Sequence, residues 1–180
     1  FGSMANDGGY LLLDVNEARD AVSHHGVPQK YIRSFVGSQE YIRGLGRMCI
    51  WIRDDEYKEA TVNPWLKARF EQVRIIRAAS ERETTKVLAK LPYRFGEVRQ
   101  VGSEKIIVTP RVSSEARPYL PVGVLTVGSI VADSTCALYD ADLWNLALIG
   151  SRLHLVWIAA VCGKLKTDYR YSNTLGWNTF

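Results

Sequence analysis

The protein has 180 residues, a pI near 9.0 and a formal net charge of +4, from 23 Lys and Arg against 19 Asp and Glu. Hydrophobic residues make up 47% and charged residues 23%, which excludes intrinsic disorder, collagen and a coiled coil as descriptions of the whole chain. This length predicts one domain or two small ones with a real core, and the modest charge permits an anionic partner without requiring one.

The N-terminal part of the chain contains one helix signal and one strand signal. Asp14 is a favourable N-cap for a helix over residues 15–23, and His24-His25-Gly26 would end that helix. Residues 47–53 form a short apolar run with charged ends, which predicts a buried strand.

The strongest helix signal is Asn63-Pro64, because Asn is a favoured N-cap and Pro is favoured at the first helical position. Lys67 and Arg74 fall on the polar side of this helix, with Arg77 at its margin. The apolar face at helical spacing is formed by Trp65, Leu66, Phe70, Val73 and Ile76.

A second helix is predicted directly after the first. Residues 80–83 have the pattern of a capping box, and Pro92 would stop the helix. Its basic stripe consists of Arg82, Lys86 and Lys90. Residues 29–99 carry a net charge of +6 and are therefore the most electropositive part of the chain. Basic stripes of this kind are typical of a solvated helix face, and also of a surface that contacts an anion.

Beyond Pro92 the pattern changes to strands and then to a second helical block. Residues 105–109 and 120–132 predict strands, the latter broken by two glycines. Asp140 or Asp142 can cap a helix that ends at Gly150. Ser151 can cap another helix, which would end at Gly163.

The apolar stretch over residues 143–162 is predicted to be two buried helices that meet at Gly150-Ser151. A membrane span is disfavoured, because an Arg in the middle costs about 2.5–3.5 kcal/mol on insertion. Helices in two blocks, at about 63–91 and 140–162, with mixed or antiparallel strands between them, predict an α+β fold in a single globular domain.

The sequence lacks the common signatures of catalysis and metal binding. It contains no G-x-x-x-x-G-K-[ST] loop, no G-x-G-x-x-G after a strand and no G-x-S-x-G elbow. The three cysteines are dispersed, and the three histidines have no ligand spacing with cysteines or carboxylates. We therefore predict no catalytic residue and no metal ligand in this chain.

The most informative polar segment is a Pro-bounded loop over residues 110–121, Pro-Arg-Val-Ser-Ser-Glu-Ala-Arg-Pro-Tyr-Leu-Pro, which we call the arginine loop. Arginine matches the guanine edge, glutamate matches the cytosine amino group, and serine matches a phosphate or a base. An Arg–Glu pair that pins the loop, with the hydroxyls in turns, would explain the same residues structurally. The candidate contact residues are Arg111, Ser113, Ser114, Glu115 and Arg117.

Two further segments add basic groups. One is the elbow Gly-Ser-Arg-Leu-His at residues 150–154, and the other is Gly-Lys-Leu-Lys-Thr-Asp-Tyr-Arg-Tyr-Ser at residues 163–172. Basic and aromatic residues that interleave are a cue for nucleic-acid binding, although edge strands show the same alternation. The 15 Arg against 8 Lys suit bidentate phosphate or guanine contacts, and equally fit a GC-rich genome. The candidates here are Ser151, Arg152, His154, Lys164, Lys166 and Arg170.

Six strings in a fixed order across the chain resemble one family. They are residues 1–13, 31–33, 37–40 and 47–51, the Pro-Arg-x-Ser-Ser-Glu start of the arginine loop, and the elbow with the tail that follows it. Together they are similar to the target recognition domain of MmeI-like (Type IIL or IIG) restriction–modification enzymes. These are single bacterial polypeptides in which a DNA adenine methyltransferase is fused to a recognition domain and often to a nuclease.

The resemblance implies that residues 1–180 are a DNA target recognition domain excised from a larger polypeptide, since Phe1 looks like native mid-chain sequence. The domain would bind double-stranded DNA sequence-specifically and present the target adenine to an S-adenosylmethionine-dependent N6-adenine methyltransferase domain of the same polypeptide. This fragment itself would be neither an enzyme nor a cofactor-binding domain. S-adenosylmethionine, and Mg for any fused nuclease, would belong to the parent enzyme in the bacterial cytoplasm, with no membrane partner.

The alternative is a protein–protein docking module within the same multidomain enzyme, in which the basic middle helices contact an acidic partner domain. A concave basic face that contains Arg111, Arg152 and Lys166 would favour DNA, whereas a flat apolar patch would favour docking.

Overall fold

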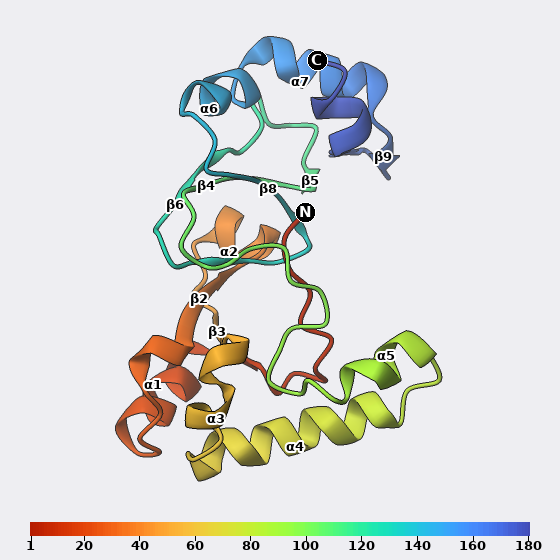
Figure 1. Ribbon diagram of the computed structural model, residues 1–180. Helices are drawn as coiled ribbons and strands as arrows, with labels where there is room; N and C mark the ends of the chain where they lie inside the picture. The colour runs from red at the N-terminus through yellow and green to blue at the C-terminus, as the bar shows by residue number, and fades with distance from the viewer. The chain divides into compact units, whose positions relative to one another are not determined.

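The computed structural model describes residues 1–180, which divide into two compact units. Unit 1 consists of Phe1–Gly2, Val36–Leu45 and Gln100–Phe180, and unit 2 consists of Ser3–Phe35 and Gly46–Arg99. Because the two units alternate along the sequence, no linker marks a boundary between them. Each unit combines helices with antiparallel strands, so the predicted α+β class is confirmed (Figure 1).

The strands of unit 2 pair antiparallel in the order β1 (Leu12–Leu13), β3 (Met48–Ile50) and β2 (Ile32–Val36). The predicted buried strand over residues 47–53 is β3, shorter than expected, with Cys49 and Ile50 fully buried. The predicted first helix is α1 (Val15–Ser23), whose first turn is capped because the Asp14 carboxylate accepts the Glu17 N–H at 2.8 Å.

Helix α4 (Pro64–Ala78) begins where Asn63-Pro64 predicts. The Asn63 side-chain oxygen accepts the backbone N–H groups of Trp65 and Leu66 at 3.0 and 3.1 Å. The prediction for the end of its apolar face is wrong, because Ile76 is 40% exposed and Arg77 is fully buried. Arg77 is tolerated in the interior since its guanidinium donates only to backbone carbonyls of unit 2.

The remaining helices of unit 2 are α3 (Tyr57–Ala60) and α5 (Glu83–Leu88), with 3₁₀ turns at Gln29–Tyr31 and Asp54–Glu56. The predicted capping box at residues 80–83 is wrong. The N-cap of α5 is Arg82, which makes no side-chain capping bond, while the Ser80 hydroxyl accepts the Arg82 N–H in a turn before the helix.

Unit 1 is built on the antiparallel sheet β6 (Gly123–Leu125), β4 (Ile106–Pro110) and β8 (Thr135–Tyr139), with β4 in the centre. Two helices, α6 (Trp144–Ile149) and α7 (Arg152–Val161), are blue in Figure 1 and share one apolar core with Ile107 of β4. The other elements are α2 (Ser38–Arg43), β5 (Val112–Ser113), β7 (Ile130–Val131), β9 (Lys164–Leu165), β10 (Asp168–Arg170) and a π-helical turn at Asn173–Trp177.

The two C-terminal helices meet at Gly150-Ser151, as predicted, and none of the helices has the length and hydropathy that crossing a bilayer requires. The proposed caps of α6 are wrong. Its N-cap is Leu143, and the Asp140 carboxylate instead accepts the Lys105 N–H at 3.0 Å. The Ser151 cap of α7 is confirmed, but this helix ends at Val161 rather than at Gly163.

Candidate nucleic-acid interface

The arginine loop and the C-terminal basic segment form one small sheet, although they are far apart in sequence. Within the loop, β5 pairs antiparallel with β10, which places Ser113 opposite Tyr169. Strand β10 also pairs with β9, so the sheet order is β5-β10-β9. We call residues 164–170 the basic hairpin. The pairing explains why the two segments act as one surface.

The two faces of this sheet differ in exposure. Ser113 of β5, Tyr169 of β10 and Lys164 of β9 are cross-strand neighbours, so their side chains share one face. Ser113 is 3% exposed and Tyr169 packs against the core of unit 1, so this face is turned inward at β5 and β10, whereas Lys164 on the edge strand β9 is exposed. Arg170 is therefore on the outer face, where it is exposed.

The tip of the basic hairpin is a two-residue turn, Lys166-Thr167, because Leu165 pairs with Asp168. Lys166 has a φ of +57°, a left-handed conformation that glycine adopts more easily than lysine. Its side chain is exposed at the end of the hairpin. The turn thus presents an exposed ammonium group at the tip of the basic hairpin.

The elbow of α7 is joined to the arginine loop by hydrogen bonding. Ser151 caps the helix, because its hydroxyl accepts the His154 N–H at 3.0 Å. Arg152 is exposed, and its Nη1 donates to the Pro118 carbonyl at 2.8 Å. This bond brings the start of α7 next to Arg117, which precedes Pro118 in the loop.

Within the arginine loop, three predicted contact residues have structural partners. Arg111 is half-buried, with its guanidinium 4.2 Å from the Phe1 ring centroid and a bond to the Asp133 carbonyl at 3.3 Å. The Ser114 hydroxyl accepts the Ala116 N–H at 3.3 Å. Glu115 pairs with Lys164 at 3.2 Å, so the structural interpretation holds for Glu115, with a lysine as partner.

Two predicted contact residues are buried, which overturns their assignment to the exposed surface. Ser113 points into unit 1, where its hydroxyl has no partner. His154 is fully buried, with Nε2 at 3.1 Å from the Tyr171 hydroxyl and its ring against the edge of Phe180 at 4.5 Å. Burial lowers the pKa of His154, so the imidazole is neutral and supports the core.

The buried His154 predicts a loss of stability on the acid side. Its pKa is lowered in the folded chain, so between that value and the ordinary value near 6.5 only the unfolded chain takes up the proton. We expect full stability above about pH 6.5 and a lower Tm at pH 5.5 than at pH 7.5. In His154→Phe the difference in Tm should shrink, and an unchanged difference would contradict this assignment.

The cations of the interface differ in their pairing from those of unit 2. Arg117, Lys166 and Arg170 are exposed, and their side chains make no hydrogen bond or ion pair in the structure. In unit 2, several cations of the electropositive middle are engaged: Arg69 with Glu17, Arg74 with Glu71, Lys86 with Glu83, and Arg94 with Asp54. Residues 29–99, which have the largest net charge, therefore have several of their cations neutralised by nearby carboxylates.

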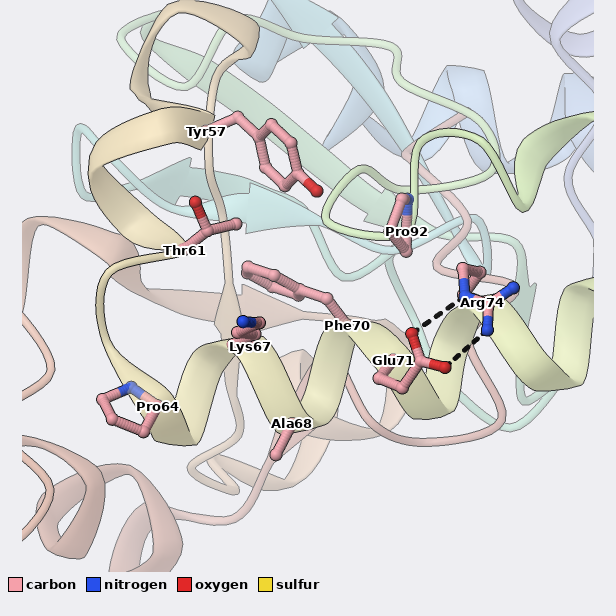
Figure 2. A pocket seen from close by; sticks show the side chains of 9 residues that line it. All are labelled: Tyr57, Thr61, Pro64, Lys67, Ala68, Phe70, Glu71, Arg74 and Pro92. Atoms are coloured by element: carbon pink, nitrogen blue, oxygen red, sulfur yellow. Dashed lines mark hydrogen bonds and ion pairs between the residues drawn. The ribbon is translucent and has the colours of Figure 1, made fainter.

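Unit 2 also contains a groove of about 690 Å³ beside α4 (Figure 2). Tyr57, Phe70 and Pro92 give it an apolar lining, and Lys67 adds one free cation. Glu71 lies on the lining and binds Arg74 through both carboxylate oxygens, at 2.8 and 2.5 Å. Arg74 and Glu71 offset each other, so Lys67 is the only unpaired charge in the lining.

The structure offers no arrangement typical of a metal or nucleotide-cofactor site. No group of three or more His, Cys, Asp or Glu side chains is placed to hold a metal ion. Gly44-Leu45-Gly46 follows helix α2, with Gly44 as its left-handed C-cap, whereas a cofactor loop would follow a strand and open a helix.

One exposed aromatic residue of the arginine loop, Tyr119, was not among the contact residues predicted from the sequence. Tyr119 is 56% exposed and lies next to Pro118 in the arginine loop. An aromatic residue in an otherwise polar, Pro-bounded segment is a usable signal, because its ring can pack against sugar or base surfaces. Phe1, which packs on Arg111, gave no such signal, since only the fold brings the two residues together.

The comparisons with known proteins agree with the predicted resemblance. The family model described as "MmeI, target recognition domain" matches residues 1–180. DNA methyltransferase A of Bacillus subtilis (strain 168) is 38% identical over 180 residues, which cover 100% of this chain and 20% of that protein. The chain is also similar to a solved structure of the Type IIL restriction-modification enzyme MmeI in complex with DNA. The TM-score is 0.93 at 29% identity, with 100% of this chain and 24% of that chain covered.

Proposed function

Because the chain belongs to the MmeI target recognition domain family, we propose that it reads the sequence of double-stranded DNA for a larger restriction–modification enzyme. The observation that carries the proposal is the joining of the arginine loop, the α7 elbow and the basic hairpin into one surface with unpaired cations. The relative that was solved with DNA has the same fold over the whole of this chain.

The exposed cations have distinct roles in this proposal. Arg117 and Arg170 carry planar guanidinium groups, which suit bidentate contacts with guanine or phosphate. Lys166, at the tip of the basic hairpin, suits a phosphate as a point charge, and Lys164 adds charge next to Glu115. Arg111 contributes its charge from a half-buried position. Phosphate contacts fix the register of the duplex and base contacts select the sequence.

The geometry of the basic hairpin fits the major groove, which is wide enough for a two-stranded β-ribbon. Holding the duplex in register is what a fused methyltransferase domain requires, because the target adenine must leave the base stack while its neighbours stay in place. We place the S-adenosylmethionine site, and Mg for any nuclease, in other domains of the parent polypeptide. The DNA that the parent polypeptide binds would be that of the bacterial cytoplasm.

The docking alternative depends on charge in the middle helices, and the structure reduces that charge. Of the four cationic side chains of α4, Arg69 and Arg74 pair with carboxylates and Arg77 is buried. On this helix only Lys67 remains unpaired, and Arg82 and Lys90 at α5 are the other unpaired cations of the middle helices. The unpaired cations of the basic hairpin and the arginine loop therefore favour DNA as the partner.

The experiment that tests the proposed function is methylome sequencing of cells that express the full-length parent enzyme with and without Arg117→Ala. We expect methylated adenines within one sequence motif for the unmodified enzyme. The variant should lose methylation or accept other bases at one position, which corresponds to about 1–3 kcal/mol of discrimination. An unchanged motif and an unchanged extent of methylation would remove Arg117 from the interface.

Lys166→Gly should separate binding from folding. Glycine adopts the left-handed backbone of the turn without a Cβ penalty, so we expect the free energy of unfolding to change by less than about 1 kcal/mol. The same change removes the ammonium at the hairpin tip, so duplex affinity should fall. Urea unfolding and fluorescence anisotropy with a labelled duplex measure the two effects, and unchanged affinity would argue against contact at the tip.

A further inference from the structure

The exposed middle of the arginine loop is held by only two long-range side-chain contacts. Residues 114–119 are all exposed, and their other hydrogen bonds are local ones within the loop. Arg152 Nη1 donates to the Pro118 carbonyl at 2.8 Å, and Lys164 Nζ pairs with Glu115 Oε2 at 3.2 Å. One contact comes from α7 and the other from the basic hairpin, so the loop is tied to both neighbouring elements.

The ends of the loop are fixed differently, by burial. Pro110 belongs to the buried strand β4, and Leu120 is 3% exposed in the core of unit 1. Between these anchors no apolar side chain of the loop's exposed middle reaches the core. A loop of this kind without restraints must become ordered when it binds DNA. This ordering weakens binding and reduces the discrimination between DNA sequences.

We propose that Arg152 and Glu115 are positioning residues that fix the arginine loop for sequence discrimination without reading a base themselves. The proposal rests on the proposed function. The Arg152 guanidinium already donates to Pro118, and the Glu115 carboxylate faces Lys164 and would repel a phosphate. Base-edge recognition needs donor groups placed to within about 0.5 Å, so a loosened loop loses discrimination before it loses affinity. In this proposal both residues act through the loop and not through direct contact with a base.

The test compares Arg152→Ala with Arg117→Ala in the 180-residue protein. The probe is a pool of duplexes with a randomised central segment, and sequencing of the bound fraction gives the discrimination. For Arg152→Ala we expect the discrimination between duplex sequences to fall by about tenfold, the usual effect of losing the preference at one base pair. The slope of log affinity against log salt concentration should stay unchanged. A slope lower by about 0.9 with unchanged discrimination would make Arg152 a phosphate contact and overturn the proposal.

The ion pair is tested by charge reversal. Glu115→Lys alone should reduce discrimination, and the double variant Glu115→Lys with Lys164→Glu should restore most of it, because the swapped charges can pair again. If Glu115 only repelled DNA, Glu115→Gln would raise affinity for all duplexes alike without changing discrimination, and the proposal for Glu115 would fail.

Hydrogen exchange in the free protein separates this proposal from the proposed function. Arg152→Ala should raise amide exchange across residues 114–119 relative to the unmodified protein, while Arg117→Ala should leave it unchanged. Equal exchange in all three proteins would overturn the positioning role, whether or not DNA binds. Raised exchange in a protein that selects no duplex sequence would support the loop restraint and overturn the proposed function.

Discussion

Arg77→Met is expected to lower the free energy of unfolding by about 3–5 kcal/mol, the largest effect of any single substitution considered for this chain. All five N–H donors of Arg77 are used, at 2.8 to 3.1 Å, on the carbonyls of Ala5, Asn6, Leu88, Leu91 and Arg94. The carbonyls of Asn6 and Arg94 have no other donor in the structure, so methionine removes the hydrogen-bond partner of both.

The reason for the size of this effect is that Arg77 ties separate segments of unit 2 together. Its guanidinium joins the N-terminal segment to the segment that follows α5, and burial lowers its pKa, which the charge of the Asp7 carboxylate offsets only in part. Lysine would keep the charge but has three donors, so Arg77→Lys should recover only part of the loss.

The matched control is Arg74→Met, three residues earlier on the same helix. Arg74 is exposed and pairs with Glu71 on the surface, so its loss should cost less than about 1 kcal/mol. Urea unfolding followed by circular dichroism and tryptophan fluorescence measures both variants. Similar midpoints for the two would show that the carbonyl cluster around Arg77 does not stabilise unit 2.

The triple variant Arg117→Ala, Lys166→Ala and Arg170→Ala should weaken duplex binding by roughly a hundredfold. We attribute about 1 kcal/mol to each charge-assisted contact, and 1.4 kcal/mol corresponds to a factor of ten. These three cations are exposed and unpaired, so their removal leaves no carboxylate without a partner. The fold should therefore be retained, and circular dichroism and Tm would verify this.

A second triple variant provides the control for charge alone. Lys67, Arg82 and Lys90 are also exposed and unpaired, and they lie on or next to the middle helices of unit 2. Replacing all three by Ala changes the net charge by the same amount. If the proposed interface is right, fluorescence anisotropy should show a small loss of affinity for this variant. Equal losses for the two variants would indicate general electrostatic attraction instead of a defined face.

The local signals in the sequence predicted those parts of the fold that depend on neighbouring residues. Asp14, Asn63 and Ser151 act as caps where expected, because capping needs only a side-chain oxygen and the first helical N–H groups. The caps proposed at Asp140, Asp142 and Ser80 failed. The Asp140 carboxylate accepts the Lys105 N–H, the Ser80 hydroxyl accepts the Arg82 N–H in a turn before α5, and α6 begins after Leu143.

The candidate interface was predicted as a set of segments but not as individual contacts. Residue types located the arginine loop, the elbow and the basic hairpin, while the pairing of β5 with β10 depends on the fold. Alternation along the strands gave no sign of which face is inward, so Ser113 was assigned to the surface. His154 resembled a polar site residue, although its ring fills the core beside Tyr171.

The most direct test of the central claim is the salt dependence of duplex binding by the 180-residue protein. Apart from the positioning residue Arg152, the face carries five cations, which are Arg111, Arg117, Lys164, Lys166 and Arg170. If counterion release from about five phosphates drives binding, affinity should fall by roughly three decades between 50 and 200 mM salt. A linear loss of that size is the predicted result. An affinity that does not change with salt would contradict the assignment of this surface to DNA.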